Sequence, residues 1–258
     1  MKTKTRSEII ELIKKNQKMR PVELREHLNI SPQIIHRHLR SLVEQEVLEA
    51  IGSPPLTYYA LAGIPDFEAV SHWINAKTLD KNPQQWVCET REIFNARLPH
   101  LKSFMNNGLS ENILPLVISI IGEIGNNSFD HNLGQWKDVP GCWFESQVTG
   151  HHLWVWIADR GQGIFQSLIK IHKHLKDDQT ALKAAFETII SGRAPEQRGN
   201  GLKYVKNNLS TTQGCGVACI SGTGHVQYGE QGEKCAALLS KNFSKVNGTF
   251  TLMTWRLK

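Results

Sequence analysis

One stretch, residues 123–131, constrains this chain more than any other. It reads Glu-Ile-Gly-Asn-Asn-Ser-Phe-Asp-His. It ends a run whose apolar residues recur at the spacing of one buried helix face: Ile113, Leu116, Val117, Ile120, Ile121 and Ile124. Glu123 and Asn127 are four residues apart, so on a helix they lie one above the other. Such a carboxylate and carboxamide can point into one pocket, although a solvated helix face can carry the same pair.

Two glycine-containing turns follow this stretch. The first, Asp-Arg-Gly-Gln-Gly at residues 159–163, comes directly after a strand-like run, residues 153–157. The second, Arg-Gly-Asn-Gly-Leu at residues 198–202, comes directly before a helical run that extends to Leu209. A last motif, Asn-Gly-Thr-Phe-Thr-Leu at residues 247–252, lies in a predicted C-terminal strand. Each motif is a weak signal alone, but four of them in this order on these elements are a strong one.

Together these four motifs resemble the GHKL superfamily of ATP-binding domains. Its pattern is a helix with E-x-x-x-N, a strand before D-x-G-x-G, G-x-G-L opening a helix, and a final G-T-x-F strand. The superfamily includes gyrase B subunits, ninety-kilodalton heat-shock chaperones, mismatch-repair ATPases, histidine kinases and anti-sigma-factor serine kinases. The resemblance covers residues 111–258. It implies an α/β sandwich of the histidine-kinase-like ATPase type, with helices on one face of a mixed sheet, that binds ATP and Mg²⁺.

The resemblance implies that four residues surround the base of the nucleotide. Asp159 would accept a hydrogen bond from the adenine amino group, for which a carboxylate is a directional acceptor. Gly161 and Gly163 would let the backbone pass close to the base and adopt unusual dihedral angles. Thr249 would contact the adenine side of the pocket.

Four further residues would hold the phosphates and the metal ion, and a fifth would act in catalysis. Gly199 and Gly201, followed by Leu202, would present backbone amides and a helix N-terminus to the phosphates. Asn127 would bind Mg²⁺ through its side-chain oxygen, since Mg²⁺ takes few protein ligands beside water and phosphate. Glu123 would act as general base toward water or a substrate hydroxyl.

Three other residues extend this set. Arg193 and Arg198 are candidates to balance phosphate charge. His131 fits the form of the first motif found in anti-sigma-factor kinases, which has a histidine four residues after the asparagine, but a core or capping histidine is equally consistent with the sequence.

The chain departs from the superfamily in ways that leave its chemistry open. The second glycine motif holds only the last part, G-x-G-L, of a fuller G-x-G-x-G. The sequence identifies no residue that accepts a phosphoryl group, and it has no large transducer domain of the gyrase or chaperone type. ATP binding is therefore better supported than hydrolysis or phosphotransfer. A protein serine kinase, a Mg-ATPase acting on a partner protein and an interaction module that has lost nucleotide chemistry remain alternatives to a nucleotide-responsive regulator.

Residues 1–62 predict a small helical unit followed by a hairpin. Helical patterns cover residues 6–17, 21–28 and 33–46, and strand-like runs at 47–51 and 57–61 flank a turn rich in Gly and Pro. This order resembles the winged helix-turn-helix of bacterial transcription regulators. The whole chain is thus predicted to be α+β, with this unit at its N-terminus.

The resemblance implies that the third helix reads DNA. Its side chains Gln33, His36, Arg37 and Arg40 would lie at base edges, while the wing would contact the DNA backbone. The segment has ten Lys or Arg and seven Glu, a surplus of three positive charges. Because non-specific affinity comes from phosphate contacts, this surplus predicts weak or dimer-dependent binding, and a homodimer is possible by analogy. A winged helix used only for protein contacts is the alternative.

Residues 63–110 are predicted as a helical connector, with helices over 67–77 and 86–104. This segment could join the two units, form a dimer surface or complete the ATP-binding domain.

Composition narrows the class of protein. The chain has 258 residues, of which 40% are hydrophobic, and no apolar run approaches the length that spans a bilayer. Five cysteines without a regular framework, and no signal peptide at the start, predict a reducing cytoplasm. Cys215 and Cys219 lack a second ligand pair at zinc spacing, so they are predicted to be small buried residues. The formal charge of +6 permits an anionic partner without requiring one.

Overall fold

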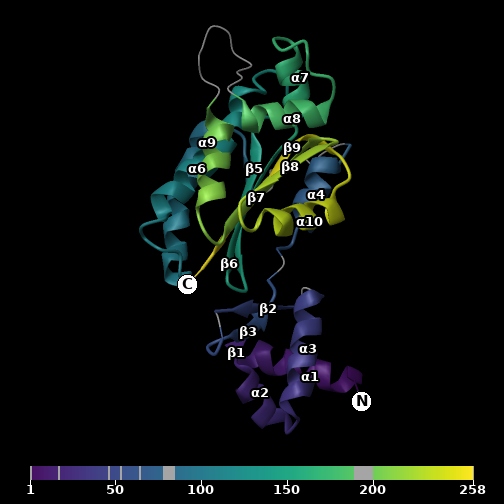
Figure 1. Ribbon diagram of the computed structural model, residues 1–258. Coiled ribbons are helices and arrows are strands. Elements are labelled where there is room, and N and C mark those ends of the chain that lie inside the picture. Colours follow the sequence, from purple (N-terminus) through teal and green to yellow (C-terminus); the bar gives the residue numbers. More distant parts are fainter. Residues whose placement is uncertain are drawn as a thin grey trace. The chain divides into compact units, whose positions relative to one another are not determined.

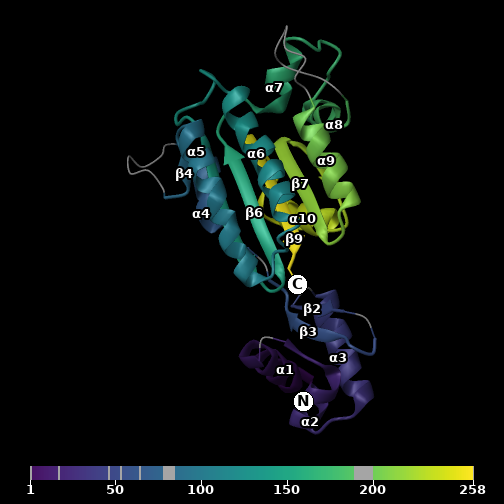
Figure 2. The same ribbon diagram turned by 90° about the vertical axis from the view of Figure 1, so that its left-hand side faces the viewer.

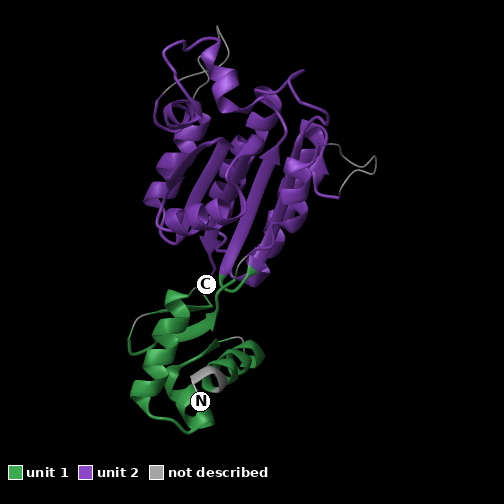
Figure 3. Cartoon of the chain, turned by 90° about the vertical axis from the view of Figure 1, so that its right-hand side faces the viewer, with its two compact units in different colours: residues 1–64, 149–151 green, residues 65–148, 152–258 purple. Residues whose placement is uncertain are grey.

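The computed structural model describes residues 2–16, 18–45, 47–52, 54–63, 65–77, 85–188 and 200–257. Contacts within the chain divide it into two compact units, coloured separately in Figure 3: residues 1–64 with 149–151, and residues 65–148 with 152–258. From residue 65 onward, the segment expected as a connector belongs to the second unit, together with the expected ATP-binding region.

The first unit has the three helices and the two hairpin strands in the predicted order, with one short strand in addition. It contains α1 (Lys2–Asn16), β1 (Lys18–Met19), α2 (Pro21–Leu28), α3 (Pro32–Glu44), β2 (Leu48–Ile51) and β3 (Tyr58–Leu61) (Figure 1). The strands form an antiparallel sheet in the order β1-β3-β2. Strand β1 was not predicted, because two residues carry no detectable alternation of apolar and polar side chains.

Helix α3 begins one residue before its predicted range, 33–46. The Ser31 hydroxyl accepts a hydrogen bond from the Ile34 amide at 3.4 Å, and Pro32 occupies the first helical position, where no amide hydrogen is needed. The inward side chains Ile35, Leu39 and Leu42 are fully buried in the core of this unit. The opposite side of the helix therefore remains available to solvent.

The second unit is built around one sheet. Its elements are α4 (Glu68–Asn75), β4 (Val87–Cys88), α5 (Arg91–Arg97), the 3-10 helix η1 (Leu98–Asn107), α6 (Leu114–Asp130), β5 (Cys142–Thr149), β6 (His152–Asp159), α7 (Gly163–Ile169), α8 (Asp178–Glu187), α9 (Gly201–Thr211), β7 (Cys215–Gly222), β8 (Gly224–Tyr228), α10 (Gly232–Asn242) and β9 (Val246–Arg256). In the described residues the strand order is β4-β5-β6-β9-β7-β8. The pairs β4–β5, β6–β9, β9–β7 and β7–β8 are antiparallel. The two-residue connection between β5 and β6 also requires an antiparallel pair, so the sheet is not the expected mixed one.

Helices cover both faces of this sheet, which corrects the expectation of helices on one face only. Strand β6 is buried along its whole length. Helices α6 and α9 lie on one side of the sheet, and α4 and α10 lie on the other (Figures 1 and 2). Leu153 and Val155 pack into a core with α6 and α9, whereas Trp154 and Trp156 pack into a second core with α4 and α10. Two apolar faces each need a cover, and α10 supplies part of the second one from a segment for which no helix was predicted.

Helix α6 carries the stretch that begins at Glu123, as predicted. The side chains of Val117, Ile120 and Ile121 are fully buried, so the apolar spacing does mark its inward face. Gly125 lies against the Phe94 ring of α5: a Cβ atom at Gly125 would lie 2.0 Å from Phe94 Cζ. This close approach holds α5 against α6.

In the part of the chain that the structure describes, no helix is long and apolar enough to cross a membrane.

The predicted helix over residues 86–104 is wrong as one element. The structure divides it into β4, α5 and η1, because Thr90 begins a new helix by accepting a hydrogen bond from the Ile93 amide at 3.3 Å. Cys215 and Cys219, predicted as small buried residues, are both buried in β7.

Candidate functional site

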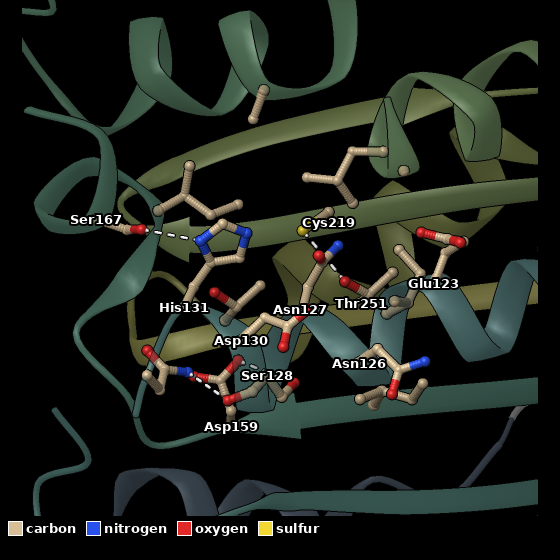
Figure 4. Close-up of a pocket in the computed structure, with 18 of the residues that line it drawn as sticks. Glu123, Asn126, Asn127, Ser128, Asp130, His131, Asp159, Ser167, Cys219 and Thr251 are labelled. Carbon is tan, nitrogen blue, oxygen red and sulfur yellow. Dashed lines mark hydrogen bonds between the residues drawn. The ribbon is translucent and has the colours of Figure 1, made fainter. Parts of the chain in front are cut away.

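A cavity of about 600 Å³ lies in the second unit, between α6, the end of β6, α7 and the start of α9 (Figure 4). The expected nucleotide-binding residues that line it are Glu123, Asn127, Asp159, Gly163, Gly201, Leu202 and Thr249. The structure thus brings together motifs that lie far apart in the sequence. Gly161 is not among the residues that line the cavity. Gly199, Arg193 and Arg198 lie outside the described residues.

Asp159 is the most constrained polar group of the cavity. Its carboxylate is buried and accepts hydrogen bonds from the Asn132 amide nitrogen at 3.0 Å, the Gly161 backbone amide at 2.9 Å and the Ser128 hydroxyl at 3.3 Å. Burial raises the pKa of Asp159 to about 6, although these donors oppose the shift. At neutral pH this carboxylate is therefore ionised and fixed in direction.

Gly161 and Gly163 shape the turn after Asp159. A Cβ atom at Gly161 would lie 2.0 Å from the Asn132 side chain, so glycine is required for Asn132 to reach Asp159. Gly163 has φ +78°, a backbone conformation that residues with a side chain rarely adopt, and it is the first residue of α7. Gly161 thus supports the cavity through Asp159, while Gly163 forms part of the wall.

Thr249 lies directly opposite Asp159 in the pairing of β6 with β9. Its hydroxyl donates to the Ser221 hydroxyl oxygen at 3.4 Å. The Ser221 oxygen also accepts from the Ile164 amide at 2.9 Å, and its hydroxyl bonds the Gly248 carbonyl at 3.0 Å. These contacts tie the start of α7 to β7 and β9, the strands that carry Ser221 and Thr249.

Glu123 lies at the other end of the site, against the start of α9. A Cβ atom at Gly201 would lie 2.4 Å from Glu123 Oε2, so the absence of a side chain lets this carboxylate approach the helix N-terminus. The backbone amides and dipole at a helix N-terminus favour anions. The first turn of α9 is therefore a place where phosphate groups can bind, next to a carboxylate.

The donor set fits a nucleotide with Mg²⁺. Asn127 lies one turn after Glu123, and both line the cavity, so an amide oxygen and a carboxylate are near the helix N-terminus that suits phosphates. The described residues contain no group of three or more His, Cys, Asp and Glu that could hold a metal ion without a ligand's help. A volume of about 600 Å³ is within the range of small-molecule sites.

His131 was expected either to belong to the kinase form of the first motif or to be a core or capping histidine. It is the residue at which α6 ends, and it also lines the cavity. Its Nδ1 atom lies 3.2 Å from the Ser167 hydroxyl of α7, so the imidazole is held in a fixed orientation (Figure 4).

Sequence reasoning missed several residues of the site. Ser128 and Asn132 follow Asn127 by one and five positions, so the length of α6 could have placed them beside Asp159. Ser167 is four residues past Gly163 on α7, so the helical period alone places both residues on the same side. Arg91 also lines the cavity and pairs with Asp130, but it comes from a separate segment and no motif announces it.

The first unit carries the predicted DNA-reading residues on α3. Gln33, His36, Arg37 and Arg40 are all exposed. Their spacing places them on one side of the helix, away from the buried residues of the core.

The comparison with protein families agrees with this first unit. A family model described as bacterial regulatory protein, arsR family, matches residues 3–50, which span α1 to β2. This similarity supports a helix-turn-helix that binds DNA in a transcription regulator. No curated protein matches the chain.

Proposed function

We propose that this chain is a transcription regulator whose second unit binds an adenine nucleotide with Mg²⁺ and thereby changes the DNA affinity of the first unit. The observation that carries the nucleotide part is the convergence of Glu123, Asn127, Asp159 and Gly201 on one cavity. These residues come from three motifs whose order and spacing resemble an ATP-binding superfamily.

The base end supports adenine as the ligand. Asp159 presents a buried, ionised acceptor whose direction is fixed by Asn132 and the Gly161 amide. An acceptor of this kind suits a donor such as the exocyclic amino group of adenine, because a hydrogen bond to a charged group contributes more than a neutral one. Thr249 stands on the neighbouring strand, where the edge of a base at Asp159 would pass.

The opposite end supports phosphates and Mg²⁺. The N-terminus of α9 provides backbone amides at Asn200 and Gly201, both of which line the cavity. Asn127 offers an amide oxygen to a metal ion that also takes phosphate oxygens. This ion would reduce the electrostatic repulsion between the Glu123 carboxylate and the phosphates.

Regulation requires that the nucleotide bind two states of the chain with different affinity. The ligand then shifts the population toward the state that it prefers, and DNA affinity changes by the same free energy as nucleotide affinity. The proposal commits to reciprocity: DNA must alter nucleotide binding by the factor with which the nucleotide alters DNA binding.

The test measures both affinities with the full chain. Duplexes selected by the chain from a random library are titrated at fixed salt, without nucleotide and with MgATP or MgADP. We expect MgATP to change the DNA dissociation constant by about fivefold or more, the lower end of typical couplings. Equal affinities would reject the regulatory coupling, and a chain that selects no duplex at low salt would reject the DNA-binding part.

Substitution of the α3 arginines provides a sharper test of the DNA part. Arg37→Ala and Arg40→Ala are each expected to weaken specific binding by about 1–3 kcal/mol if they contact bases, or to reduce the salt dependence if they contact phosphates. Both side chains are exposed, so the fold should persist, as circular dichroism can verify. The control is Arg256→Ala, an exposed arginine of the second unit. If Arg37→Ala and Arg40→Ala bind DNA as tightly as the native chain and Arg256→Ala do, α3 is not the reading helix.

A second candidate function is a protein serine kinase or ATPase, favoured by the position of Glu123 next to the N-terminus of α9. A carboxylate beside bound phosphates can remove a proton from water or from a substrate hydroxyl.

Glu123→Gln separates this chemistry from binding. The variant is expected to lower hydrolysis of labelled ATP, or its transfer to partner proteins, by about 100-fold or more, while nucleotide affinity changes little. Glu111→Gln, at an exposed glutamate of the same unit, is the matched control. Native chain that turns over no ATP, alone or with partners, would leave the regulator as the surviving candidate.

A further inference from the structure

The cavity has an imbalance of charge among its described residues. Three carboxylates line it, those of Glu123, Asp130 and Asp159. Arg91 is the single lysine or arginine in that lining, as far as the structure describes it. A nucleotide would add the negative charge of its phosphates. Such a ligand needs a cation in addition to Mg²⁺, and Arg91 is placed to be one.

The position of Arg91 is set by packing that is independent of any ligand. Arg91 is the first residue of α5, directly after Thr90, whose hydroxyl caps the helix. Phe94, one turn later, is fully buried against Gly125 of α6 and lies 6.2 Å from the Phe129 ring. Helix α5 is thereby anchored with its N-terminal residue at the cavity.

Asp130 holds the Arg91 side chain at the cavity through an ion pair between Nη2 and Oδ1. The two side chains are 40% and 23% exposed, so water screens the pair and it adds little to stability. A guanidinium has five N–H donors in a planar fork that matches phosphate oxygens two at a time. A phosphate entering the cavity can therefore share Arg91 with Asp130 or take it from Asp130.

We infer that Arg91 binds the phosphate groups of the nucleotide and that these groups compete for it with Asp130. The inference rests on the proposed function, and it assigns to the segment before α6 a direct part in the site. It also makes Arg91 a residue that distinguishes ligands by their phosphates, whereas Asp159 distinguishes them by their base.

The test compares ligands that share a base and differ in phosphates. ATP, ADP and adenosine are titrated by calorimetry into the full native chain and into Arg91→Gln, both with Mg²⁺. We expect the variant to bind ATP about tenfold more weakly, the effect of losing one charge-assisted hydrogen bond. ADP affinity should fall by the same or a smaller factor, and adenosine affinity should stay within about twofold.

Three further variants separate the role of Arg91 from general effects of charge and structure. Arg91→Lys keeps the charge but loses the planar fork, so it should recover part of the ATP affinity. Asp130→Asn removes the competitor, so it should bind ATP at least as tightly as the native chain. Lys102→Gln removes an exposed cation elsewhere in the unit and should leave all three affinities unchanged.

The outcomes separate this inference from the proposed function. If Arg91→Gln binds ATP as tightly as the native chain, or loses ATP and adenosine by equal factors, Arg91 does not bind phosphate and the inference fails alone. If the native chain binds none of the three ligands, the proposed function fails and the inference fails with it.

Discussion

Replacing Asp159 with asparagine is expected to weaken MgATP binding by about 10- to 100-fold. The reason is the loss of a charged acceptor, because a hydrogen bond to a charged group contributes about 1.5–3 kcal/mol. Asparagine keeps the shape of the side chain, and its oxygen can still accept from the Gly161 amide and from Asn132. The change therefore removes the charge while leaving the turn after β6 intact.

A ligand-side control identifies which contact is lost. Purine riboside triphosphate has the phosphates of ATP but lacks the amino group that Asp159 is proposed to bind. Its affinity is expected to be low for the native chain and to change little in Asp159→Asn. If calorimetry finds that the analogue loses as much affinity as ATP, Asp159 acts on the shape of the site and the proposed adenine contact is wrong.

The pH dependence of binding follows from the pKa of Asp159, which burial raises to about 6. Below this value the carboxyl carries a proton and no longer offers a charged acceptor. ATP affinity of the native chain is therefore expected to decrease as the pH falls from 7 to 5, whereas Asp159→Asn should show a flat profile over that range. Titrations at several pH values in one buffer system measure both curves.

Stability should change in the opposite direction to binding. The folded pKa lies above the ordinary value of 3.8, so the native state binds this proton more tightly than the unfolded state does. Stability from this group is present below about pH 4 and is lost as the pH rises to about 6. At pH 7 the ionised carboxylate thus costs roughly 3 kcal/mol, taking 1.36 kcal/mol per pKa unit. Urea unfolding at pH 7 should find Asp159→Asn at least as stable as the native chain.

Local patterns were sufficient to find most of the candidate site. The apolar spacing before Glu123 predicted α6, which fixed where Glu123 and Asn127 point. The apolar run before Asp159 predicted that this residue ends a strand, and Gly201 was predicted to open a helix. Each of these inferences needs only neighbouring residues, because the helical and strand periods act over a few positions. The ligand roles of these residues stay predictions.

Contacts between distant segments could not be predicted in this way. Arg91 reaches the cavity because Phe94 packs against Gly125, a contact between segments about thirty residues apart that no motif describes. The cover of the second sheet face by α10 was likewise missed. The apolar pattern of a strand indicates that the strand is buried, but it does not indicate which helix covers it. The α3 surface was easier, because its exposed and buried sides follow from one helix alone.

Arg160 also makes contacts with distant segments that the sequence did not predict, although it lies within the glycine motif at residues 159–163. In the sequence it is an unspecified position between Asp159 and Gly161, yet its side chain is fully buried. Its guanidinium donates to the backbone carbonyls of Trp73, Ile74 and Ala76 at the C-terminal end of α4. It also donates to both carboxylate oxygens of Asp138. One side chain thereby ties the turn that carries Asp159 to α4 and to the segment before β5.

Arg160→Ala is therefore expected to destabilise the second unit by about 3–5 kcal/mol, because it removes a fully buried guanidinium and leaves three backbone carbonyls without their donor. The alanine would leave three carbonyls and Asp138 without this donor. All seven tryptophans lie between residues 73 and 255, so their fluorescence during urea unfolding reports the second unit. Arg256→Ala, at an exposed arginine of β9, should shift the midpoint little.

The pH dependence of the stability lost in Arg160→Ala distinguishes the contribution of the Arg160–Asp138 ion pair from that of packing. Arg160 holds the pKa of Asp138 below its ordinary value. A lowered folded pKa contributes stability above the ordinary value and loses it as the pH falls through the folded value. The difference between the native chain and Arg160→Ala should thus be largest at neutral pH and should shrink in acid. A difference that stays constant down to pH 3 would assign the effect of Arg160 to its packing and carbonyl contacts, and would remove Asp138 from the explanation.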